Sequence, residues 1–600
     1  MAERILLVQL ADIGDLILTT PALAALRAAR PADHLTLLTT AHAAPVLPPD
    51  LVNDVITLDR QQFNSSLAFL KPANLRRILG LGRYDTVVFF HHFTLKLGTL
   101  KFWLIARGCG AKRRIGLQNG NGWFLTQSIP DAGFGASHQA QYWLDLVALL
   151  GADASPRPAQ VNRAAFTGLP QHDQPTVIIH AGSGGYSLAR RWEPAKFAAV
   201  ADGLHEQHGM RVVLVGGPND DGAAVQAAMQ HPAVDLSGKT TLAQLADVIG
   251  NADLFIGADS GVMHVAAATG TPVIAIFGPS NAQAWGPWTP ESPSVVLRSG
   301  VECSPCSYVG HGIGLREGCA ARTCMKLVTP TMVIEAASGL LRGQTAVIPE
   351  PIDPPSHPWQ RVQVLGLPVD GITYPQLLDQ LDTWITAGER AHHICTTNPE
   401  FTMIAQHDPN FANILRRADL CVPDGIGMVL AARRIGVSLP ERVTGSDGLP
   451  IIAERAAQKG WTLFFLGAAP GIADQAAAVL RQQYPDLQIV GIYSGSPAPE
   501  EEDALVEMIN TSGADLLFVA YGAPKQDKWI ARNLPRLQVS AAMGVGGAFD
   551  YIAGVVPRAP VWMRKIGMEW LYRLIREPWR IKRQTRLPRF VLAVLLRGEN

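Results

Sequence analysis

The first half of the chain carries two aspartates at positions where a carboxylate could act on a ligand. Asp15 follows Gly14, shortly after the apolar run RILLVQL, and Asp259 ends the run LFIGAD. Ligands of parallel sheets bind at the carboxyl ends of the strands, so a carboxylate there can serve as a general base. Asp15 could instead only cap the helix that follows, which we expect to open near Leu16 after a tight turn at Gly14.

The same half contains groups that suit a diphosphate. The helix expected after LFIGAD would begin at Ser260 and Gly261, where free N–H groups and the positive dipole end favour a phosphate or sugar hydroxyls. His264 lies one turn inside this helix and could equally face the core. The glycine-rich segment HAGSGGYSLARRW couples backbone N–H groups to Arg190 and Arg191, a combination that can grip a diphosphate.

A second set of polar residues follows predicted strands in the other half. Asp424 lies in the tripeptide PDG, where it could be a base or only a turn residue. Thr396 and Asn398 come at the end of the preceding strand. Gln526, in GAPKQD, and Asp550, in GVGGAFD, follow later strands and could bind uracil or sugar hydroxyls. We therefore expect a second ligand site at this sheet edge.

Cysteines offer a candidate metal site. Cys303, Cys306, Cys319 and Cys324 fall within 22 residues, and four thiolates can hold zinc. The spacing of the last two is looser than in usual zinc pairs, so reduced structural thiols are the favoured interpretation. The chain has no apolar-flanked D-x-D motif for a metal-assisted reaction and no G-x-G-x-x-G after a first strand. We therefore expect no cofactor and disfavour a dehydrogenase.

Alternating apolar runs and helical patterns must position these residues. RILLVQL, LTLLTT, VITLD and DTVVFF are predicted strands, and the pattern restarts after about residue 170 with TVIIHAG, RVVLVGG, LFIGAD and PVIAIFG. Such alternation indicates parallel sheets, so we expect two doubly wound halves with a cleft between them. AHHICTTNPE, WTLFFLGAAPG, LQIVGIYSG, ADLLFVAYGAP and VSAAMGVGGAFD predict a third α/β unit.

Length and composition limit the organisation and the class of protein. The 600 residues have formal net charge zero and are 48% hydrophobic, typical of a large globular chain. Five prolines between residues 349 and 358 predict a linker over 344–358. The expected domains are 1–165, 166–343, 359–558 and a basic appendage, 559–600. We expect no signal peptide or transmembrane helix, and the odd cysteine count indicates reduced thiols in a cytoplasm.

Three motifs of the first half together resemble one known family. GDLILTTPAL, the glycine loop with RRW, and DSGVMHVAAATGTPVIAIFGPS resemble the ADP-heptose:lipopolysaccharide heptosyltransferases (glycosyltransferase family 9) over about residues 4–340. The resemblance implies a GT-B fold, inversion at the anomeric carbon, and Asp15 as the base that deprotonates the acceptor hydroxyl. It also implies that the donor and its diphosphate bind a set of residues already named: Arg190 or Arg191, Asp259, Ser260, Gly261 and, nearby, His264.

The second half resembles another family. TNPE, PDG, ERVTGSD, PKQD, GVGGAFDYIAG, RAP and EWLYRLIREPWR occur in the order typical of the WecG/TagA/CpsF family (glycosyltransferase family 26), over about residues 361–590. This resemblance implies transfer of N-acetylmannosamine, its uronic acid or a related hexose from UDP to a polyprenyl diphosphate bearing N-acetylglucosamine. Asp424 would be the general base, with Thr396 close to the acceptor hydroxyl. The pocket would be lined by Asn398, Arg442, Gln526 and Asp550.

The C-terminal appendage is basic although the whole chain is neutral. Residues 560–600 hold ten Lys/Arg and three Glu. The resemblance implies that this segment docks over the active site, where Arg573, Arg580 and Arg583 would stabilise the leaving diphosphate without a metal. The other cations and the tryptophans would bind an anionic membrane surface. A solvated basic helix or a nucleic-acid patch gives the same local pattern, but the rest of the chain has no basic stripe, so no nucleic acid is expected.

These interpretations combine into one prediction, an α/β protein in which two glycosyltransferases act on one lipid-linked glycan of a bacterial surface polysaccharide. The partners would be nucleotide sugars (a UDP-sugar or ADP-heptose), a polyprenyl diphosphate or lipopolysaccharide-type acceptor, and the inner leaflet of the cytoplasmic membrane, with a homo-oligomer left open. The alternative from another class is that the first half is a non-catalytic module that binds the acceptor or a partner.

Overall fold

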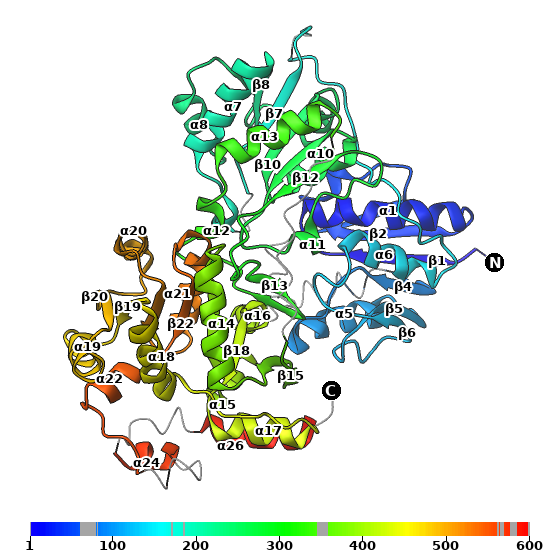
Figure 1. The fold of residues 1–600 in the computed structure, drawn as a ribbon. Helices are drawn as coiled ribbons and strands as arrows, with labels where there is room; N and C mark the ends of the chain where they lie inside the picture. The colour runs from blue at the N-terminus through cyan, green and yellow to red at the C-terminus, as the bar shows by residue number, and fades with distance from the viewer. Residues whose placement is uncertain are drawn as a thin grey trace. The chain divides into compact units, whose positions relative to one another are not determined.

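The computed structural model describes residues 2–59, 78, 80, 82–169, 172–183, 187–344, 358–560, 563, 569–576 and 585–597. The chain forms two compact units (Figure 1). The first comprises Met1–Ser299 and Pro305–Ile348, and the second comprises Gly300–Ser304 and Pro349–Asn600. The short stretch Gly300–Ser304 thus groups with the second unit, although the sequence placed it within 166–343. Apart from its two end residues, the expected linker lies outside the described residues.

The first unit contains two six-stranded parallel sheets with equivalent strand orders, β3-β2-β1-β4-β5-β6 and β12-β11-β10-β7-β8-β9. The first is built from β1 (Arg4–Gln9), β2 (His34–Thr40), β3 (Asp54–Leu58), β4 (Thr86–Phe89), β5 (Arg113–Gln118) and β6 (Gln127–Pro130). The second is built from β7 (Thr176–His180), β8 (Arg211–Val215), β9 (Val234–Asp235), β10 (Leu254–Ala258), β11 (Val273–Ile276) and β12 (Ser294–Leu297). Counted from the first strand of each, both follow the doubly wound dinucleotide-binding order, which confirms the two Rossmann-like halves.

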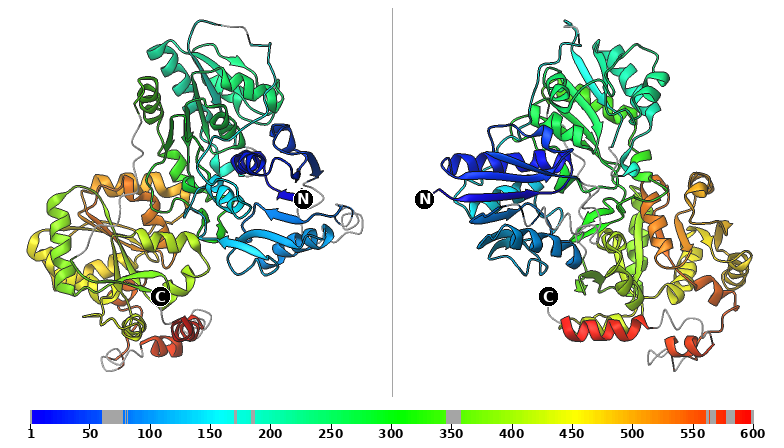
Figure 2. Two further views of the ribbon diagram at one scale, coloured as in Figure 1. Left: turned by 90° about the vertical axis from the view of Figure 1, so that its right-hand side faces the viewer. Right: turned by 180° about the vertical axis from the view of Figure 1, so that it is seen from behind.

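Helices cover both faces of the first sheet because its strands are apolar on both faces. The helices of this half are α1 (Ile13–Ala29), α5 (Lys96–Gly108) and α6 (Gln139–Ala148). Ile5 and Leu7 of β1 share a core with α1 and α6, whereas Leu6 and Val8 share a core with α5. Figure 2 shows α1 along one face of this sheet. A strand buried on both sides must be continuously apolar, as the stretch from Ile5 to Val8 is.

The second half of this unit is completed by helices and one hairpin. The helices are α7 (Pro194–His208), α8 (Gly222–Ala228), α9 (Leu242–Gly250), α10 (Gly261–Thr269), α11 (Ala282–Trp285), α12 (Thr323–Lys326) and α13 (Pro330–Leu341). Strands β13 (Ser307–Val309) and β14 (Gly312–Gly314) form an antiparallel hairpin. The N-terminus of α10 follows β10 directly, as the sequence predicted.

The start of α1 differs from the expectation. The helix begins at Ile13, before Leu16, so Gly14 lies in its first turn and not in a preceding tight turn. Gly14 is required for space: a Cβ there would lie 2.5 Å from Cδ2 of His264 in α10. The absence of a side chain therefore lets the N-terminal turn of α1 approach the first turns of α10.

The second unit is a separate α/β domain around a six-stranded parallel sheet of order β18-β17-β22-β21-β19-β20. Its strands are β17 (His392–Thr397), β18 (Leu420–Pro423), β19 (Thr462–Gly467), β20 (Gln488–Tyr493), β21 (Leu516–Ala520) and β22 (Ala541–Gly544). An antiparallel hairpin precedes them, β15 (Arg361–Val364) with β16 (Leu367–Asp370). This sheet confirms the third α/β unit.

Helices pack on both faces of this sheet as well. They are α14 (Tyr374–Ala387), α15 (Pro399–Ala405), α16 (Pro409–Arg417), α17 (Ile426–Arg434), α18 (Gly445–Lys459), α19 (Ile472–Gln483), α20 (Glu502–Ser512), α21 (Lys525–Asn533) and α22 (Ala548–Ile552). Leu463 and Phe465 of β19 join the core with α14, α18 and α19, whereas Phe464 and Leu466 join the core with α20 and α21.

Two helices of the basic appendage are described, α24 (Glu569–Arg576) and α26 (Arg586–Arg597). Phe590 and Val594 of α26 are buried in a small core with Met428 of α17, and Figure 1 shows the two helices side by side. Arg580 and Arg583 lie outside the described residues, as does the side chain of Arg573. Among the helices that the structure describes, none combines the length and apolar character needed to cross a bilayer.

Candidate active sites

A cavity of about 920 Å³ opens at the carboxyl ends of β1 and β10 in the first unit. Its lining includes six of the residues that the sequence proposed: Asp15, Arg190, Asp259, Ser260, Gly261 and His264. The volume falls in the range of small-molecule sites, about 300–1,000 Å³. β1 and β10 are central strands next to β4 and β7, where the strand order reverses, and ligands of doubly wound sheets bind at such places.

Asp15 takes part in the start of α1 and also lines the cavity. Its Oδ2 accepts a hydrogen bond from the backbone N–H of Asp12 at 3.2 Å, as an N-terminal helix residue does, and its Oδ1 accepts one from Trp285 Nε1 at 3.2 Å. Burial in the cavity and the nearby Asp12 charge raise the pKa of Asp15 to about 6, against the lowering effect of these hydrogen bonds. A carboxyl group with this pKa is ionised at neutral pH yet basic enough to accept a proton.

The two candidate arginines take different positions. Arg190 Nη1 forms an ion pair with Asp259 Oδ2 at 3.0 Å, and both side chains line the cavity. Arg191 forms ion pairs with Asp220 at 3.5 Å and Asp221 at 3.1 Å, outside this cavity. The structure therefore favours Arg190 over Arg191 as a ligand for an anion in the cavity. Residues 184–186 of the glycine loop lie outside the described part of the chain.

Ser260 ends a buried polar chain. Its Oγ accepts from the backbone N–H of Met263 at 3.3 Å and lies 3.2 Å from Nδ1 of His180, whose Nε2 lies 3.3 Å from Asp220 Oδ2. This chain fixes the first turn of α10 and leaves its backbone N–H groups directed at the cavity. His264, one turn further, is buried, and burial lowers its pKa to about 3, so it is neutral at physiological pH.

Sequence reasoning missed several groups that line this cavity. Trp285 touches the candidate base from α11, and Lys101 of α5 lines the first-half side, where burial lowers its pKa. His91, directly after β4, is also in the lining, and burial holds its pKa well below the usual range. Neither a motif nor a local spacing marks these residues. Only the position of His91 just after the apolar run DTVVFF could have suggested it.

In the second unit, the predicted residues gather at one edge of the sheet. Thr396 is buried near the end of β17 and donates to the Gly544 carbonyl at 3.2 Å. Asn398 caps α15, since its Oδ1 accepts from Phe401 N–H at 2.9 Å. Asp424 is half-buried just after the neighbouring strand β18, and its backbone N–H donates to the Thr397 carbonyl at 2.8 Å. The register of β17 and β18 thus brings Asp424 close to the Thr396–Asn398 segment.

The other predicted pocket residues hold the surrounding loops. Gln526 is buried and its Oε1 accepts from the N–H groups of Gly522 at 3.2 Å and Gly546 at 3.0 Å, which ties the loops after β21 and β22 together. Gln526 therefore stabilises the positions of these two loops. Asp550 is half-buried in α22, after β22.

Arg442 is placed by a carboxylate that the sequence did not single out. Its Nη2 lies 3.4 Å from Asp447 Oδ2, and Arg558 donates to the other Asp447 oxygen at 2.6 Å. Burial raises the pKa of Tyr374 to about 12, with smaller contributions from the charges of Asp447 and Asp424. The Tyr374 phenol therefore lies within electrostatic reach of both aspartates and belongs to the surroundings of the candidate base.

The cysteine stretch does not form the zinc site that the sequence allowed. Among the described residues, a single group of three or more His, Cys, Asp or Glu side chains has its ligand atoms close enough to share a metal ion, and it contains none of these four cysteines. Cys306 and Cys324 are buried, and Cys303 and Cys319 are half-buried. Burial raises the pKa of the Cys324 thiol to about 12.

Comparisons with known proteins identify both parts of the chain. The model of the glycosyl transferase WecG/TagA/CpsF family matches residues 362–599, and that of glycosyltransferase family 9 (heptosyltransferase) matches residues 74–310. The chain is 33% identical over 218 residues to the N-acetylglucosaminyldiphosphoundecaprenol N-acetyl-beta-D-mannosaminyltransferase of Bacillus spizizenii, covering 36% of this chain and 84% of that enzyme. The protein of the same name from Bacillus subtilis is 32% identical over 207 residues, covering 34% and 80%.

One solved structure resembles the first part. The glycosyl transferase family 9 protein of Veillonella parvula is 26% identical, with a TM-score of 0.45, covering 57% of this chain and 98% of that one. The motifs, the two family matches and the coverage of the Bacillus enzymes lead to one conclusion: the chain is a glycosyltransferase that belongs to the WecG/TagA/CpsF family and also carries a glycosyltransferase family 9 region.

Proposed function

We propose that the chain is bifunctional and that each unit adds one sugar to the same lipid-linked glycan of a bacterial surface polysaccharide. The second unit transfers N-acetylmannosamine, its uronic acid or a related hexose from a UDP-sugar. Its acceptor is a polyprenyl diphosphate bearing N-acetylglucosamine. Support comes from the two Bacillus relatives, whose names state mannosaminyl transfer to N-acetylglucosaminyldiphosphoundecaprenol.

In the second unit, Asp424 takes the proton of the acceptor hydroxyl as this oxygen attacks the anomeric carbon from the face opposite UDP, which gives inversion. Thr396 and Asn398 lie at the adjoining strand end and orient the acceptor and donor. The departing diphosphate gains charge, which Arg573, Arg580 and Arg583 stabilise in place of a metal ion. Two charge-assisted hydrogen bonds, each worth roughly 1.5–3 kcal/mol, would supply about a thousandfold in rate.

In the first unit, Asp15 is the base of a second inverting transfer. The observation that carries this proposal is a carboxyl group of pKa about 6 on the wall of a 920 Å³ cavity shared with the Arg190–Asp259 pair. Arg190 and the N-terminus of α10 bind the donor diphosphate, which is part of ADP-heptose or a UDP-sugar. A purely acceptor-binding module would gain nothing from a destabilised carboxylate in this cavity.

The protein binds the inner leaflet of the cytoplasmic membrane through α26. Two residues of this helix, Phe590 and Val594, anchor one face in the second unit, whereas the opposite face exposes Leu592 by 56%, Leu595 by 58% and Leu596 by 75%. Exposed apolar side chains beside a cation suit the interface of an anionic bilayer. Arg589 is exposed and free to serve as that cation, whereas Arg586 forms an ion pair with Glu400 at 2.7 Å.

The experiment that tests the proposed function supplies the full chain with a panel of UDP- and ADP-sugars and a polyprenyl-diphosphate-N-acetylglucosamine analogue, and the products are weighed by mass spectrometry. We expect the Asp15→Asn chain to add only the sugar of the second unit. The Asp424→Asn chain should add only the sugar of the first unit, provided that the acceptor of the first unit is supplied. The unaltered chain should add both sugars. Joining two sites on one chain raises the effective concentration of the shared intermediate. If the unaltered chain forms only one of the two products with every combination of donors, the chain has a single activity.

A further inference from the structure

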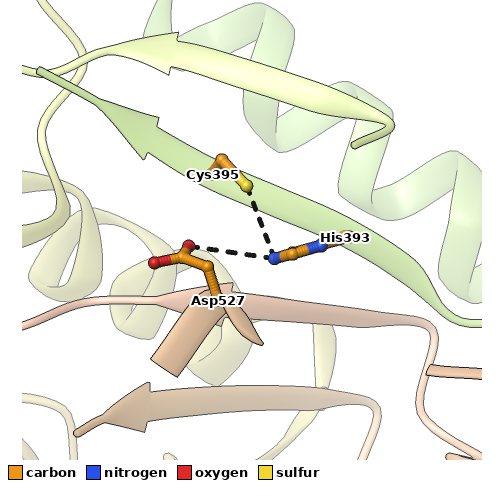
Figure 3. A group of neighbouring side chains, drawn as sticks. All are labelled: His393, Cys395 and Asp527. Atoms are coloured by element: carbon orange, nitrogen blue, oxygen red, sulfur yellow. Dashed lines mark hydrogen bonds and ion pairs between the residues drawn. The ribbon is translucent and has the colours of Figure 1, made fainter. Parts of the chain in front are cut away.

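A buried group of three potential metal ligands lies in the second unit, away from any role proposed above. His393 and Cys395 alternate along β17 and point to the same face, and Asp527 reaches them from the first turn of α21 (Figure 3). His393 and Asp527 are completely buried, and so is Cys395. His393 Nε2, Cys395 Sγ and a carboxylate oxygen of Asp527 all lie within 4.8 Å of one another.

The Asp527 carboxylate has one distant ion-pair partner, His393, and no hydrogen bond. Neither of its oxygens has a hydrogen-bond partner, and its nearest recorded partner, His393 Nε2, lies 3.8 Å away, beyond hydrogen-bond reach. An isolated buried carboxylate is strongly destabilising, so buried acidic groups are paired or coordinate metals. Gly544 contributes to the arrangement, because a Cβ on it would collide with Gln526 and come within 3.0 Å of Asp527 Oδ1.

The two nitrogens of the His393 ring are held very differently. Nδ1 lies 2.8 Å from Glu302 Oε2, a normal charged hydrogen bond within the second unit, whereas Nε2 lies 3.4 Å from Cys395 Sγ and 3.8 Å from Asp527 Oδ1. An imidazolium shared by two carboxylates would be expected to bond closely on both sides. On the Nε2 side, the contact with Cys395 is a hydrogen bond to sulfur and the contact with Asp527 is an ion pair beyond hydrogen-bond reach.

We propose that His393, Cys395 and Asp527 bind one structural zinc ion. Zinc–ligand bonds of about 2.0–2.3 Å in a tetrahedron place neighbouring N and S atoms roughly 3.6 Å apart and N and O atoms roughly 3.3 Å apart. The observed 3.4 Å and 3.8 Å lie within about half an ångström of these values, whereas Cys395 Sγ and the Asp527 carboxylate, which lie within 4.8 Å of one another, must approach to roughly 3.6 Å when the ion binds. Because both Asp527 oxygens lack hydrogen-bond partners, the carboxylate can bind through both and complete four-coordination.

Glu302 completes the site as the partner of a metal-binding histidine. Zinc-bound imidazoles usually donate their other N–H to a carboxylate, which fixes the tautomer and the ring orientation. Glu302 accepts in this way from Nδ1. On binding, Cys395 loses its thiol proton and the His393 imidazolium loses its Nε2 proton, both to solvent, and the charges of Cys395, Asp527 and Zn²⁺ sum to zero. The mixed sulfur, nitrogen and oxygen set favours zinc over magnesium or calcium.

The test measures metal content and is independent of the proposed function, since sugar transfer is not its readout. The full chain is stripped with a chelator, loaded with zinc alone, desalted and analysed for zinc per chain, with cobalt absorption as a second measurement. We expect Cys395→Ser and Asp527→Asn to hold one zinc fewer than the unaltered chain and to lose the thiolate–cobalt absorption band. Glu302→Gln should retain the ion with an affinity about 10- to 100-fold weaker.

Cys421→Ser is the matched control. Cys421 is equally buried, lies opposite Cys395 in the β17–β18 register, and donates its thiol to the Leu415 carbonyl at 3.2 Å. This variant should bind as much zinc as the unaltered chain. Equal zinc in folded Cys395→Ser, Asp527→Asn and unaltered chains overturns the proposal. If the variants do not fold, X-ray absorption of the unaltered chain decides: one sulfur among N/O neighbours supports the site, and no zinc or an all-sulfur shell overturns it.

Discussion

The indole N–H of Trp285 donates a hydrogen bond to the Asp15 carboxylate at 3.2 Å, across 270 positions of the sequence. Asp15 stands at the start of α1 in the first Rossmann-like half, whereas Trp285 ends α11 in the second. A donor to the ionised form of a carboxyl group lowers its pKa. The protonation of the candidate base in one half is therefore adjusted by a side chain of the other.

First-unit transfer should lose activity as the pH falls through about 6, the pKa of Asp15. The base works only when ionised, so kcat/KM should fall about tenfold for each pH unit below that value. Trp285→Phe removes a donor that favours the ionised form, so the acid limb should move to higher pH. The measurement is a pH–rate profile in an Asp424→Asn background. Trp288→Phe is the control, because the Trp288 indole donates to the Arg157 carbonyl at 2.8 Å. If neither variant shifts the acid limb, the role given to Trp285 is contradicted.

Asp15→Asn should reduce first-unit turnover by about 100- to 10,000-fold while making the protein more stable at pH 7. The folded-state pKa of about 6 lies above the unfolded value near 3.8, so the ionised carboxylate costs stability above that range. Removing the charge should gain on the order of 1 kcal/mol in the free energy of unfolding at pH 7 and nothing at pH 4, where Asp15 is protonated. Urea unfolding at the two pH values checks the sign, and near-normal transfer by this variant would refute the assignment.

Asp424→Asn should abolish second-unit transfer to the lipid acceptor and leave binding of the UDP-sugar intact. A general base acts on the acceptor hydroxyl, so the change removes an interaction made in the transition state and spares donor affinity. Turnover with a short-chain acceptor analogue and titration calorimetry with the donor measure the two quantities separately. Lost donor binding would instead make Asp424 a donor ligand.

Leu592→Glu combined with Leu596→Glu should weaken binding to anionic vesicles by at least tenfold without changing turnover on a water-soluble acceptor. Both side chains are exposed on α26, so their replacement leaves the Phe590 and Val594 anchor intact. Removing residues 560–600 is a less clean test, because it would also uncover Met428. Val479→Glu, at an exposed apolar position on α19, serves as the control in vesicle sedimentation. Unchanged sedimentation of the α26 variant would exclude this helix as the membrane contact.

The fold and the motif residues could be predicted because their signals are local. Apolar runs such as RILLVQL form strands, and Asp15, Asp259 and Asp424 each follow a strand of a different sheet. Within each sheet, parallel pairing brings the carboxyl ends of the strands to one edge. The different positions of Arg190 and Arg191 could not be predicted. Each of these adjacent side chains is held by acidic residues that come from other parts of the sequence.

The contact between the buried side chains of His393 and Asp527 could not be predicted from the sequence either. His393 and Asp527 meet only because β17 pairs with β22 and β22 with β21, which places α21 beside β17. Neither HHICTT nor PKQD contains a pattern that predicts this contact. From the sequence alone, Asp527 is one residue of the motif PKQD and His393 is one residue of a predicted strand.

The assignment of Gly300–Ser304 to the second unit has a consequence for how the two units can be separated. Besides Glu302, this stretch offers carbonyls to Asn410 at 2.7 Å, from Cys303, and to Arg417 at 2.6 Å, from Ser304. A gene cut at the proline-rich segment would encode a second unit that lacks these acceptors. Subcloning at the linker therefore divides the second unit instead of isolating it.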